Sequence, residues 1–350
     1  MSSSVRKILE HQPIKASAPC RIDSGGTWDI KALALPLERS APVTVNMALN
    51  LRTWVTLSPL KDGWAKVSSE GFPRGAQHPY GSFPFKPPFG LFFAAISHFG
   101  FHGLRVRIRS DSPVKSALGG SSTALIALIK ALSKLRVMLG EKKLSAKDIL
   151  HLGYHLEDGV SGGNCGIQDQ AAAVYGGVNR WTWHYGVRSS PYKREPLLGL
   201  KGQKELSNRI LVAFSGKSHV SSRINRTWIN DFLSGPTRPG WVKVNDKVNR
   251  LAEAIKEEDW NKAASLLRDE MAIRREITPD ALIPITEKLV DQAESAKCGA
   301  RFTGAGAGGS IWALGEVDKI RRLRKIWETT LASTRGARIL DCAIDPLGAK

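Results

Sequence analysis

Residues 113–124 read Pro-Val-Lys-Ser-Ala-Leu-Gly-Gly-Ser-Ser-Thr-Ala, and this stretch decides how the rest of the chain is interpreted. The residues before it, 104–109, alternate apolar and basic side chains, which predicts a β-strand. The residues after it, 125–135, have the apolar spacing of an amphipathic helix. A loop rich in glycine and serine therefore leads from a strand into the N-terminus of a helix.

A loop of this kind is a candidate anion site. Gly119 and Gly120 let a ligand approach the backbone closely, and the first amide groups of a helix have no intrahelical acceptors. The helix dipole adds about half a positive charge at the same point. Ser121 and Ser122 could cap the helix or hold a metal ion bound to phosphate. A plain capped helix has the same local pattern, so this stretch alone leaves both interpretations open.

The composition is that of a globular protein with a large core. The chain has 350 residues, of which 42% are hydrophobic and 24% charged, and its length is sufficient for two domains. No long apolar run predicts a membrane span, and the N-terminus is charged where a signal peptide needs an apolar core. Four scattered cysteines, without metal-ligand spacing, predict free thiols. We therefore expect a cytoplasmic protein.

The net charge of +19 suggests three classes of partner: nucleic acid, an anionic membrane surface or an anionic small substrate. The basic residues are spread along the chain, and neither zinc-finger spacing nor an RNA-binding signature accompanies them. This pattern favours solvated basic surfaces, with no membrane partner, and it disfavours nucleic acid. A phosphorylated small substrate is the secondary interpretation.

The N-terminal region combines a weakly structured start with a second glycine turn. Residues 1–17 predict a poorly anchored lead-in. A short strand then runs into the turn Gly25-Gly26, which Arg21 and Asp29 flank. Ordinary hairpins use the same turn chemistry, so the turn alone is weak support for a site.

Two segments around the central loop add candidate functional elements. Residues 71–90 are rich in glycine, proline and aromatic side chains, which predicts a long loop of the kind that often carries function. Residues 145–159 predict a helix with Ser145 as its cap. Asp169 lies close to the start of a short helix that ends before Gly176, where the helix dipole favours an ionised carboxylate. A simple capping carboxylate is the other interpretation of Asp169.

The second half of the chain predicts mostly helices, with a domain boundary near residue 205. Near its end, Gly304, Gly306 and Gly309 have the spacing of a dinucleotide fingerprint. The residues that follow, 310–314, predict a strand rather than a helix, which argues against that interpretation. A glycine hairpin packed against a phosphate or against the first glycine loop is favoured instead.

The three glycine-bearing stretches, 18–29, 113–124 and 302–309, together resemble the GHMP kinase superfamily over nearly the whole chain. The central stretch is similar to the family pattern Pro-x-x-x-Gly-Leu-Gly-Ser-Ser, with Ala117 in place of a glycine and Gly120 in place of the first serine. The resemblance implies an α+β fold of two domains with the active site between them. Residues 1–205 would be an ATP-binding domain like ribosomal protein S5 domain 2, and residues 206–350 a ferredoxin-like domain.

Within the superfamily, the sugar kinases are the nearer branch. The stretch Cys-Gly-Ile-Gln-Asp-Gln, residues 165–170, resembles the one that carries the catalytic aspartate of galactokinase and of the heptose phosphate kinases. Arg21 and the Gly-Gly-Thr-Trp-Asp turn resemble the N-terminal stretch of fucokinase and heptose 7-phosphate kinase. The interval from Arg21 to Asp29 is one residue shorter than is usual there.

The resemblance implies a role for each matched residue. Asp169 would accept the proton of the attacking hydroxyl, and Arg21 would keep Asp169 ionised and stabilise the transferring charge. Ser121 and Glu157 would hold Mg²⁺. Asp29 would bind sugar hydroxyls together with Gly25 and Gly26. The ATP phosphates would contact the two glycine loops through Leu118, Gly119, Gly120, Ser121, Ser122, Gly304, Gly306 and Gly308.

Three functions remain open at this stage. The first is an ATP-dependent kinase that phosphorylates a sugar or sugar-phosphate hydroxyl. The favoured position is the anomeric hydroxyl of a heptose 7-phosphate-like or fucose-like sugar, and the expected oligomeric state is a monomer or homodimer. The second is a GHMP kinase for a non-sugar alcohol of the mevalonate or homoserine type, against which the Asp29 turn argues. The third is a non-catalytic protein that binds anions or nucleic acid, against which Ser121, Glu157 and Asp169 argue.

Overall fold

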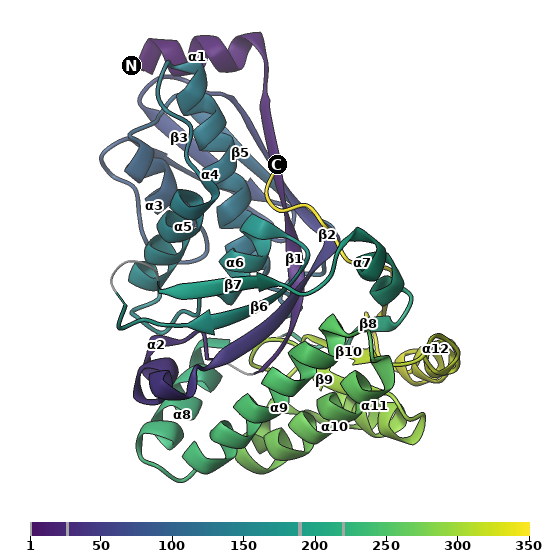
Figure 1. Ribbon diagram of the computed structural model, residues 1–350. Helices are drawn as coiled ribbons and strands as arrows, with labels where there is room; N and C mark the ends of the chain where they lie inside the picture. Colours follow the sequence, from purple (N-terminus) through teal and green to yellow (C-terminus); the bar gives the residue numbers. More distant parts are fainter. Residues whose placement is uncertain (1, 26–27, 188–190, 219–220) are drawn as a thin grey trace.

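The computed structural model describes residues 2–25, 28–187, 191–218 and 221–350. They form two units, each a β-sheet with packed helices (Figure 1). The first unit is a seven-stranded sheet with the strand order β4-β3-β5-β2-β6-β7, and β1 pairs with β2. Its strands are β1 Ile14–Ser24, β2 Val43–Pro59, β3 Trp64–Ser69, β4 Ala76–Pro79, β5 Leu104–Ser110, β6 Val178–Trp183 and β7 Tyr192–Pro196.

Strand β2 organises this sheet because it is long enough to take part in two separate pairings. Its first residues pair with β6 and its last residues with β5, while β1 runs antiparallel along nearly its whole length. The only parallel pair between the named strands joins β3 to β5. The expected strand at 104–109 is therefore confirmed as β5, at the centre of the sheet.

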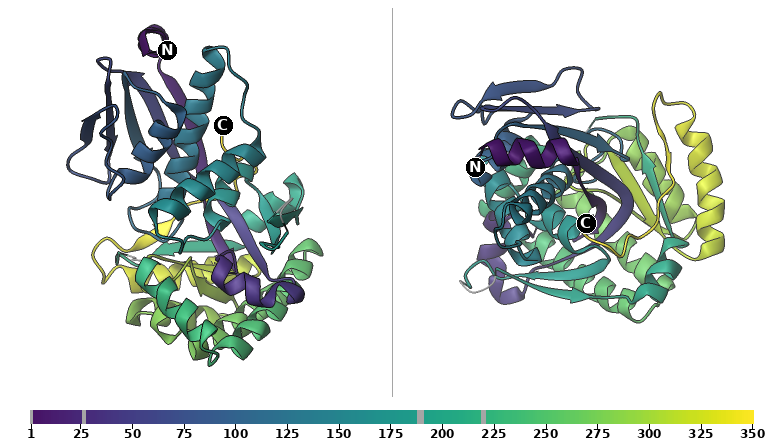
Figure 2. Two further views of the ribbon diagram at one scale, coloured as in Figure 1. Left: turned by 90° about the vertical axis from the view of Figure 1, so that its left-hand side faces the viewer. Right: turned by 90° about the horizontal axis from the view of Figure 1, so that it is seen from above.

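Helix α4, Gly120–Met138, is the central helix of the first unit. It packs against β1 and β2, and neighbouring helices surround it (Figure 2). Because nearly all of its middle residues are apolar, it is buried on several sides rather than along one stripe. The other helices of this unit are α1 Ser2–His11, α2 Lys31–Ala34, α3 Gly90–Phe99, α5 Ala146–Val160, α6 Gln168–Tyr175 and α7 Leu200–Ser207, with a 3₁₀ turn, η1, at Leu35–Ser40.

The second unit is a four-stranded antiparallel sheet with the order β11-β8-β10-β9. Helices α10, α11 and α12 pack against this sheet, and α9 packs between α10 and β2 of the first unit. The bounds are β8 Ile210–Phe214, α8 Ser221–Leu233, α9 Arg238–Lys256, α10 Trp260–Ile277, η2 Pro279–Ala281, α11 Pro284–Ser295, β9 Gly299–Phe302, β10 Ser310–Leu314, α12 Val317–Leu331 and β11 Arg338–Leu340. The expected two-part α+β architecture is confirmed.

The end of the chain returns to the first unit. The backbone amide and carbonyl of Lys350 both bond to Ser17 on β1, at 2.9 Å. Arg52 on β2 forms an ion pair with Asp345 and donates to the carbonyl of Gly348 at 2.9 Å. The contiguous division at residue 205 stays a prediction, and this tail ties the two units together.

The expectation of a poorly anchored lead-in at residues 1–17 is wrong. Residues 2–11 form α1, whose Val5 and Leu9 are buried, and β1 begins at Ile14. The spacing of Val5, Ile8 and Leu9 places three apolar side chains on one helical face, and this face packs on the first unit. Burial of that face anchors the N-terminal residues. The expectation is wrong because the polar residues at the start of the sequence outnumber the apolar ones that form this face.

Candidate functional site

A cavity of about 410 Å³ lies where the two units meet. Its walls come from β1 and the turn after it, from β2 and β5, from the N-termini of α4 and α6, and from α8 and the β9–β10 loop. All three glycine-bearing stretches of the sequence therefore reach one place. The segment 71–90, expected to be a long loop, contains the short strand β4 and contributes Gly71, Phe72 and Pro88 to the wall.

The N-terminus of α4 forms one wall of the cavity. The helix begins at Gly120, so Gly120, Ser121 and Ser122 belong to its first turn rather than to a preceding loop. The N-cap is Gly119, and no side chain caps the helix, so the interpretation of Ser121 and Ser122 as caps is wrong. These three residues line the cavity, and their amides have no intrahelical acceptors, which is the arrangement that binds phosphate.

Gly119 brings the α4 terminus against Asp169. Its φ angle is +78°, and a Cβ atom added there would lie 3.1 Å from the carboxyl carbon of Asp169. Asp169 itself projects from the first turn of α6, as the sequence suggested. Only glycine satisfies both the left-handed backbone and this close contact.

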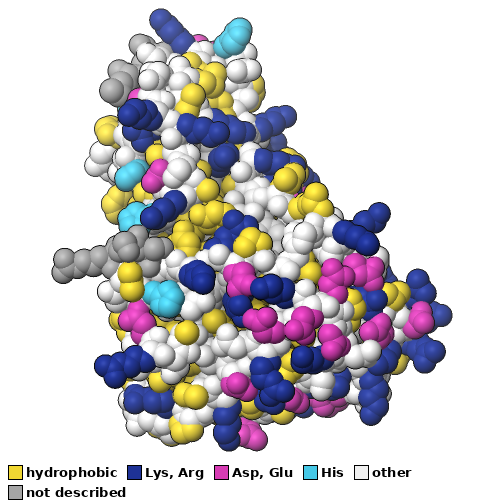
Figure 3. All heavy atoms as spheres, viewed as in Figure 1, with side chains coloured by type: hydrophobic (Ala, Val, Ile, Leu, Met, Phe, Trp, Pro, Cys, Tyr) yellow, Lys and Arg dark blue, Asp and Glu magenta, His cyan; other side chains and the backbone are white. Residues whose placement is uncertain are grey.

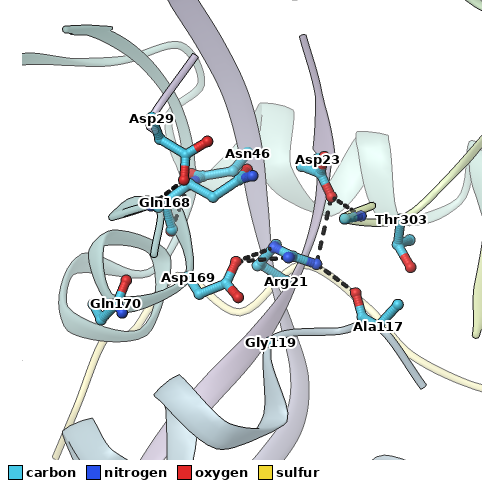
Figure 4. A network of polar contacts seen from close by, with 12 residues as sticks. Arg21, Asp23, Asp29, Asn46, Ala117, Gly119, Gln168, Asp169, Gln170 and Thr303 are labelled. Carbon is cyan, nitrogen blue, oxygen red and sulfur yellow. Dashed lines mark hydrogen bonds and ion pairs between the residues drawn. The ribbon is translucent and has the colours of Figure 1, made fainter. Parts of the chain in front are cut away.

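Asp169 and Arg21 form an ion pair in the cavity. Arg21 donates from Nε to Oδ1 of Asp169 at 2.7 Å, and its Nη2 lies 2.6 Å from the same oxygen (Figure 4). The Arg21 side chain is buried, whereas that of Asp169 is 24% exposed and remains accessible from the cavity. Burial alone would lower the pKa of Arg21, but Asp169 and Asp23 more than offset it and raise the pKa. Arg21 is therefore permanently charged.

A buried ionic network fixes Arg21 through its Nη1 atom. Nη1 of Arg21 donates to the carbonyl of Ala117 at 2.7 Å and lies 3.4 Å from Oδ1 of Asp23. Asp23 also accepts from the amide of Gly304 at 2.8 Å and from Arg301 at 2.9 Å. Arg301 in turn binds Glu270 at 3.1 Å, and the side chains of Asp23, Arg301 and Glu270 are all fully buried. One carboxylate thus links the site arginine to the second unit.

Asp29 is buried in the same cavity, beside the start of α6. Its Oδ2 accepts from the amide of Gln168 at 3.1 Å, and its carbonyl accepts from the hydroxyl of Tyr185. Its Oδ1 has no partner among the described residues. Burial, followed by the negative charge of Asp169, raises the pKa of Asp29 to about 7. Such a carboxylate is ready to accept hydrogen bonds from a ligand.

Glu157 on α5 faces the α4 terminus. It accepts from Gln170 at 2.7 Å, and the hydroxyls of Ser122 and Ser121 act to lower its pKa. Burial, together with Asp169, raises the pKa of Glu157 to about 7, and the described part of the chain provides it with no ion pair. Hydroxyl and carboxylate oxygens beside a phosphate site are donors that suit Mg²⁺. The residues present therefore fit this ion, although no cluster of three or more His, Cys, Asp or Glu residues forms a metal site among the described residues.

The other predicted contacts divide into two groups. Gly304 lines the cavity, whereas Gly306 packs against the carbonyl of Ala281 and Gly308 against that of Ser218. Leu118 is buried, and its carbonyl accepts from the amide of Arg21. Gly25 packs against Val43 and Val248 outside the cavity wall, and Gly26 lies outside the described residues. Gly306, Gly308, Leu118 and Gly25 therefore shape the loops instead of lining the cavity.

Sequence reasoning missed several lining residues. Lys115 is, with Arg21, a cation of the cavity wall, and Gln168 and Asn225 each have a buried side-chain oxygen without a described partner. Thr53, Phe72 and Ile108 line the part of the cavity nearest the large sheet. Three of these residues had a signal: Lys115 lies within the central motif, Gln168 within the stretch 165–170 and Phe72 within the expected loop 71–90. Thr53, Ile108 and Asn225 come from β2, β5 and α8, whose facing side is fixed by the fold.

The glycine hairpin of residues 302–309 behaves as predicted. It joins β9 to β10, which pair antiparallel. A Cβ on Gly309 would lie 2.6 Å from the Cβ of Ala117, and one on Gly304 would lie 3.4 Å from the carbonyl of Ala117. The hairpin is therefore packed on the first glycine loop. Ala117 has a φ of +61°, which explains why a glycine suits that position in the pattern.

Comparisons with known proteins agree with this fold. Residues 90–177 match the N-terminal domain of the GHMP kinases, and residues 251–331 match the C-terminal domain. In an alignment of 347 positions that covers 91% of this chain, it is 23% identical to the bifunctional fucokinase/GDP-fucose pyrophosphorylase of Arabidopsis thaliana, of which it spans 31%. It is 26% identical over 227 residues to the D-glycero-alpha-D-manno-heptose 7-phosphate kinase of Campylobacter jejuni, covering 62% of this chain and 63% of that protein.

Galactokinases and mevalonate kinases are also among the curated relatives. The chain spans less than two thirds of the length of each of these relatives. Among solved structures, the galactokinase of Lactococcus lactis complexed with galactose superposes with a TM-score of 0.75 at 17% identity, over 99% of both chains. At this identity the superposition establishes the fold.

Among the residues that the structure describes, no helix has both the length and the apolar character needed to cross a bilayer.

Proposed function

Because this chain carries the N- and C-terminal domains of the GHMP kinases, we propose that it is an ATP-dependent phosphotransferase whose acceptor is a sugar hydroxyl. One observation carries the proposal. The Asp169–Arg21 pair lies directly against the α4 N-terminus, with the buried carboxylate of Asp29 in the same cavity. A phosphate site, a candidate base and a hydroxyl-binding carboxylate are thereby within reach of one another.

The chemistry needs alignment and charge neutralisation more than covalent help. The amides of Gly120, Ser121 and Ser122 would bind phosphate oxygens of ATP, with Lys115 close by. Asp169 would orient the acceptor hydroxyl and take its proton as the new bond to the γ-phosphorus forms, while the bond from that phosphorus to the β–γ bridging oxygen breaks and ADP leaves. Arg21 would fix the orientation of that carboxylate through the ion pair and stabilise the transferring charge.

Ser121 and Glu157 would hold Mg²⁺, which when bound neutralises phosphate charge and draws the phosphate oxygens into place. The raised pKa of Glu157 fits this role, since a nearby cation stabilises the ionised form that burial disfavours. The apolar wall of Phe72, Pro88 and Ile108 offers a place for the base of the nucleotide.

Asp29 favours a sugar over the carboxylate-bearing alcohols of the mevalonate or homoserine type. Three carboxyl groups, Asp29, Glu157 and Asp169, line the cavity, and Arg21 is already paired with one of them. A carboxylate group placed beside Asp29 would meet like charge there, whereas hydroxyl groups at that position would find free acceptor oxygens on Asp29 and Gln168. The site thus fits a polyol acceptor best. Heptose 7-phosphate-like and fucose-like sugars at the anomeric hydroxyl are the first candidates.

The test is an ADP-release assay with Mg²⁺-ATP over a panel of acceptors. The panel contains D-glycero-D-manno-heptose 7-phosphate, L-fucose, galactose, mannose, uronic acids, mevalonate and homoserine. Turnover confined to one or more sugars is the expected result. Turnover confined to mevalonate or homoserine would move the assignment to the second class of GHMP kinase. A protein that binds DNA in a salt-sensitive way and transfers no phosphate would contradict the proposal.

A further inference from the structure

Trp28, next to Asp29 in the chain, lies in the second unit's aromatic core rather than in the first unit's core. Its side chain is fully buried. Its ring meets that of Phe232 on α8 at 6.1 Å and that of Trp241 on α9 at 5.6 Å, both edge to face. Such ring pairs stabilise a fixed geometry beyond the apolar area that they bury. The residue that directly precedes Asp29 is therefore packed against α8 and α9 of the second unit.

The cluster that receives Trp28 is closely packed and contains a buried cation. Trp241 packs on Trp228, and the guanidinium of Arg274 lies 4.3 Å from each of these two ring centroids. Arg274 is fully buried and is fixed at Nε by Thr278 at 3.0 Å. A cation held among aromatic faces resists rearrangement, because moving any ring exposes that charge to an apolar environment.

The first unit holds Asp29 from the other side. The carboxylate accepts from the amide of Gln168 at the start of α6, the helix that carries Asp169. A Cβ on Gly166 would lie 1.8 Å from Oδ2 of Asp29, so the carboxylate rests directly on that glycine. The orientation of Asp29 toward the site consequently depends on contacts with both units, and Trp28 supplies the contact with the second.

We propose that Trp28 is a positioning residue for the acceptor: its ring docks the turn into the α8–α9 cluster and so fixes Asp29 where it binds the acceptor hydroxyls. This inference rests on the proposed kinase function and adds a residue that acts without touching the substrate. Binding of the acceptor then requires that α8 and α9 pack against the first unit. Binding of the nucleotide depends on the α4 terminus and does not require this packing.

The ring itself, rather than a hydrogen bond, carries this role. The Nε1 atom of Trp28 is buried and has no partner among the described residues. Trp28→Phe therefore removes no hydrogen bond and keeps an aromatic ring, whereas Trp28→Ala empties the position. Comparing the two variants shows how the acceptor KM depends on the size of the packed ring.

Steady-state kinetics with the best sugar of the acceptor panel tests the proposal. For Trp28→Ala the KM of the acceptor should rise about 10- to 100-fold, the range expected for a displaced binding group, while the KM of ATP changes by less than about twofold. Trp28→Phe should lie between Trp28→Ala and wild type. The matched control is Trp327→Ala, which empties a fully buried tryptophan position on α12. It should lower the Tm without changing either KM.

A pH profile provides a second readout that mere destabilisation would not move. The pKa of Asp29 is raised chiefly by burial, so a loosened turn that admits water lowers it. The acid limb of kcat/KM for the acceptor should then move to lower pH in Trp28→Ala and stay in place in Trp327→Ala. Both variants leave unchanged the charged and titratable groups that interact electrostatically with Asp29. These groups are Arg21, Asp23, Tyr154, Cys165, Asp169 and Tyr185.

The outcomes separate this inference from the function on which it rests. If Trp28→Phe and Trp28→Ala both keep the kcat and the acceptor KM of the wild type, the positioning role is overturned and the proposed kinase function is unaffected. Equal rises in both KM values, or the same rise in Trp327→Ala, would show general destabilisation and also overturn it. Absence of phosphate transfer by the wild type would overturn both. If Trp28→Ala fails to fold, Trp28→Phe against Trp327→Phe decides the question by the same criteria.

Discussion

At the scale of single residues, the site depends on how closely Asp169 approaches the α4 N-terminus. Gly119 makes that approach possible, because its position combines a left-handed backbone with a contact to the carboxylate. Arg21 then fixes the orientation of the carboxylate with two nitrogen atoms on one oxygen. Backbone geometry, rather than the identity of the charged groups alone, sets where the candidate base lies relative to the phosphate site.

Gly119→Ala tests this arrangement. The added Cβ would lie 3.1 to 3.3 Å from three atoms of Asp169 and must displace it, so kcat should fall at least about tenfold. The matched control is Gly140→Ala, which has a φ of +88° but open space around the added atom. Both variants should lose about 1 kcal/mol of stability from backbone strain, and only Gly119→Ala should lose activity. Equal kcat values in the two variants would count against the contact.

Asp29→Asn should stabilise the protein in a pH-dependent way. In the folded chain the pKa of Asp29 is about 7, above its ordinary value of 3.8, so the folded form retains a proton that the unfolded chain releases. This favours folding below about pH 4, and the benefit is lost as pH rises to about 7. Relative to wild type, the free energy of unfolding of Asp29→Asn should therefore increase between pH 4 and 8, by up to about 4 kcal/mol.

Urea denaturation of both proteins at pH 4, 6 and 8 measures this difference. A difference that stays constant with pH would mean that Asp29 titrates normally. The same substitution should raise the KM of the acceptor, since an amide offers one acceptor oxygen where the carboxylate offers two.

At the scale of elements, β1 is the strand that joins the two units. It carries Arg21 toward the site and Asp23 toward Arg301 on β9, and the turn after it carries Trp28 into the α8–α9 cluster. Buried ion pairs add little net stability but fix one arrangement, because an unpaired partner is very costly. The network thus gives a strict register between β1 and the β9–β10 hairpin.

Arg301→Met should be strongly destabilising. It leaves the fully buried carboxylates of Asp23 and Glu270 without their shared partner, which costs about 3 to 5 kcal/mol. The control is Arg321→Met on α12, whose partner Asp318 is largely exposed; that change should cost less than about 1 kcal/mol. Thermal unfolding of the two variants measures both effects, and similar Tm values would argue against a buried network.

The sequence predicts the elements of this protein better than their contacts. The central strand, α4, α5 with its Ser145 capping box and the β9–β10 hairpin follow from local periodicity and turn chemistry. The resemblance to the family pattern predicted the juxtaposition of Asp169, Arg21 and the first glycine loop. The Asp23–Arg301 pair and the burial of Trp28 could not be predicted, because their partners lie some 200 residues or more away and nothing in the local pattern points to them.

At the scale of the whole molecule, the positive charge is unevenly divided. Residues 1–205 contain 27 Lys and Arg against 14 Asp and Glu, whereas residues 206–350 contain 24 against 18. On the face in Figure 3, Lys and Arg side chains are spread widely, and Asp and Glu lie mostly on the lower half. The unit that carries the α4 terminus is therefore the more basic one, which favours the approach of an anionic nucleotide.

Kinetics at varied ionic strength test the effect of this charge. Raising the salt from about 0.05 to about 0.5 M should lower kcat/KM for ATP about 2- to 10-fold, because long-range attraction is screened. The acceptor provides the comparison. A neutral sugar should keep its KM, whereas a sugar phosphate should lose affinity in parallel with ATP. A salt-independent kcat/KM for ATP would show that the net charge has no part in nucleotide capture.

The most direct test of the whole account is phosphorus NMR of the reaction products, with wild-type protein and Asp169→Asn under the same conditions. With Mg²⁺-ATP and the active sugar of the panel, the wild type should give ADP and one sugar-phosphate resonance in equal amounts. Asp169→Asn keeps the shape of the site but cannot take the proton, so its rate should fall about 10²- to 10⁴-fold. Sugar phosphate formed by Asp169→Asn at a rate near that of the wild type would contradict the account.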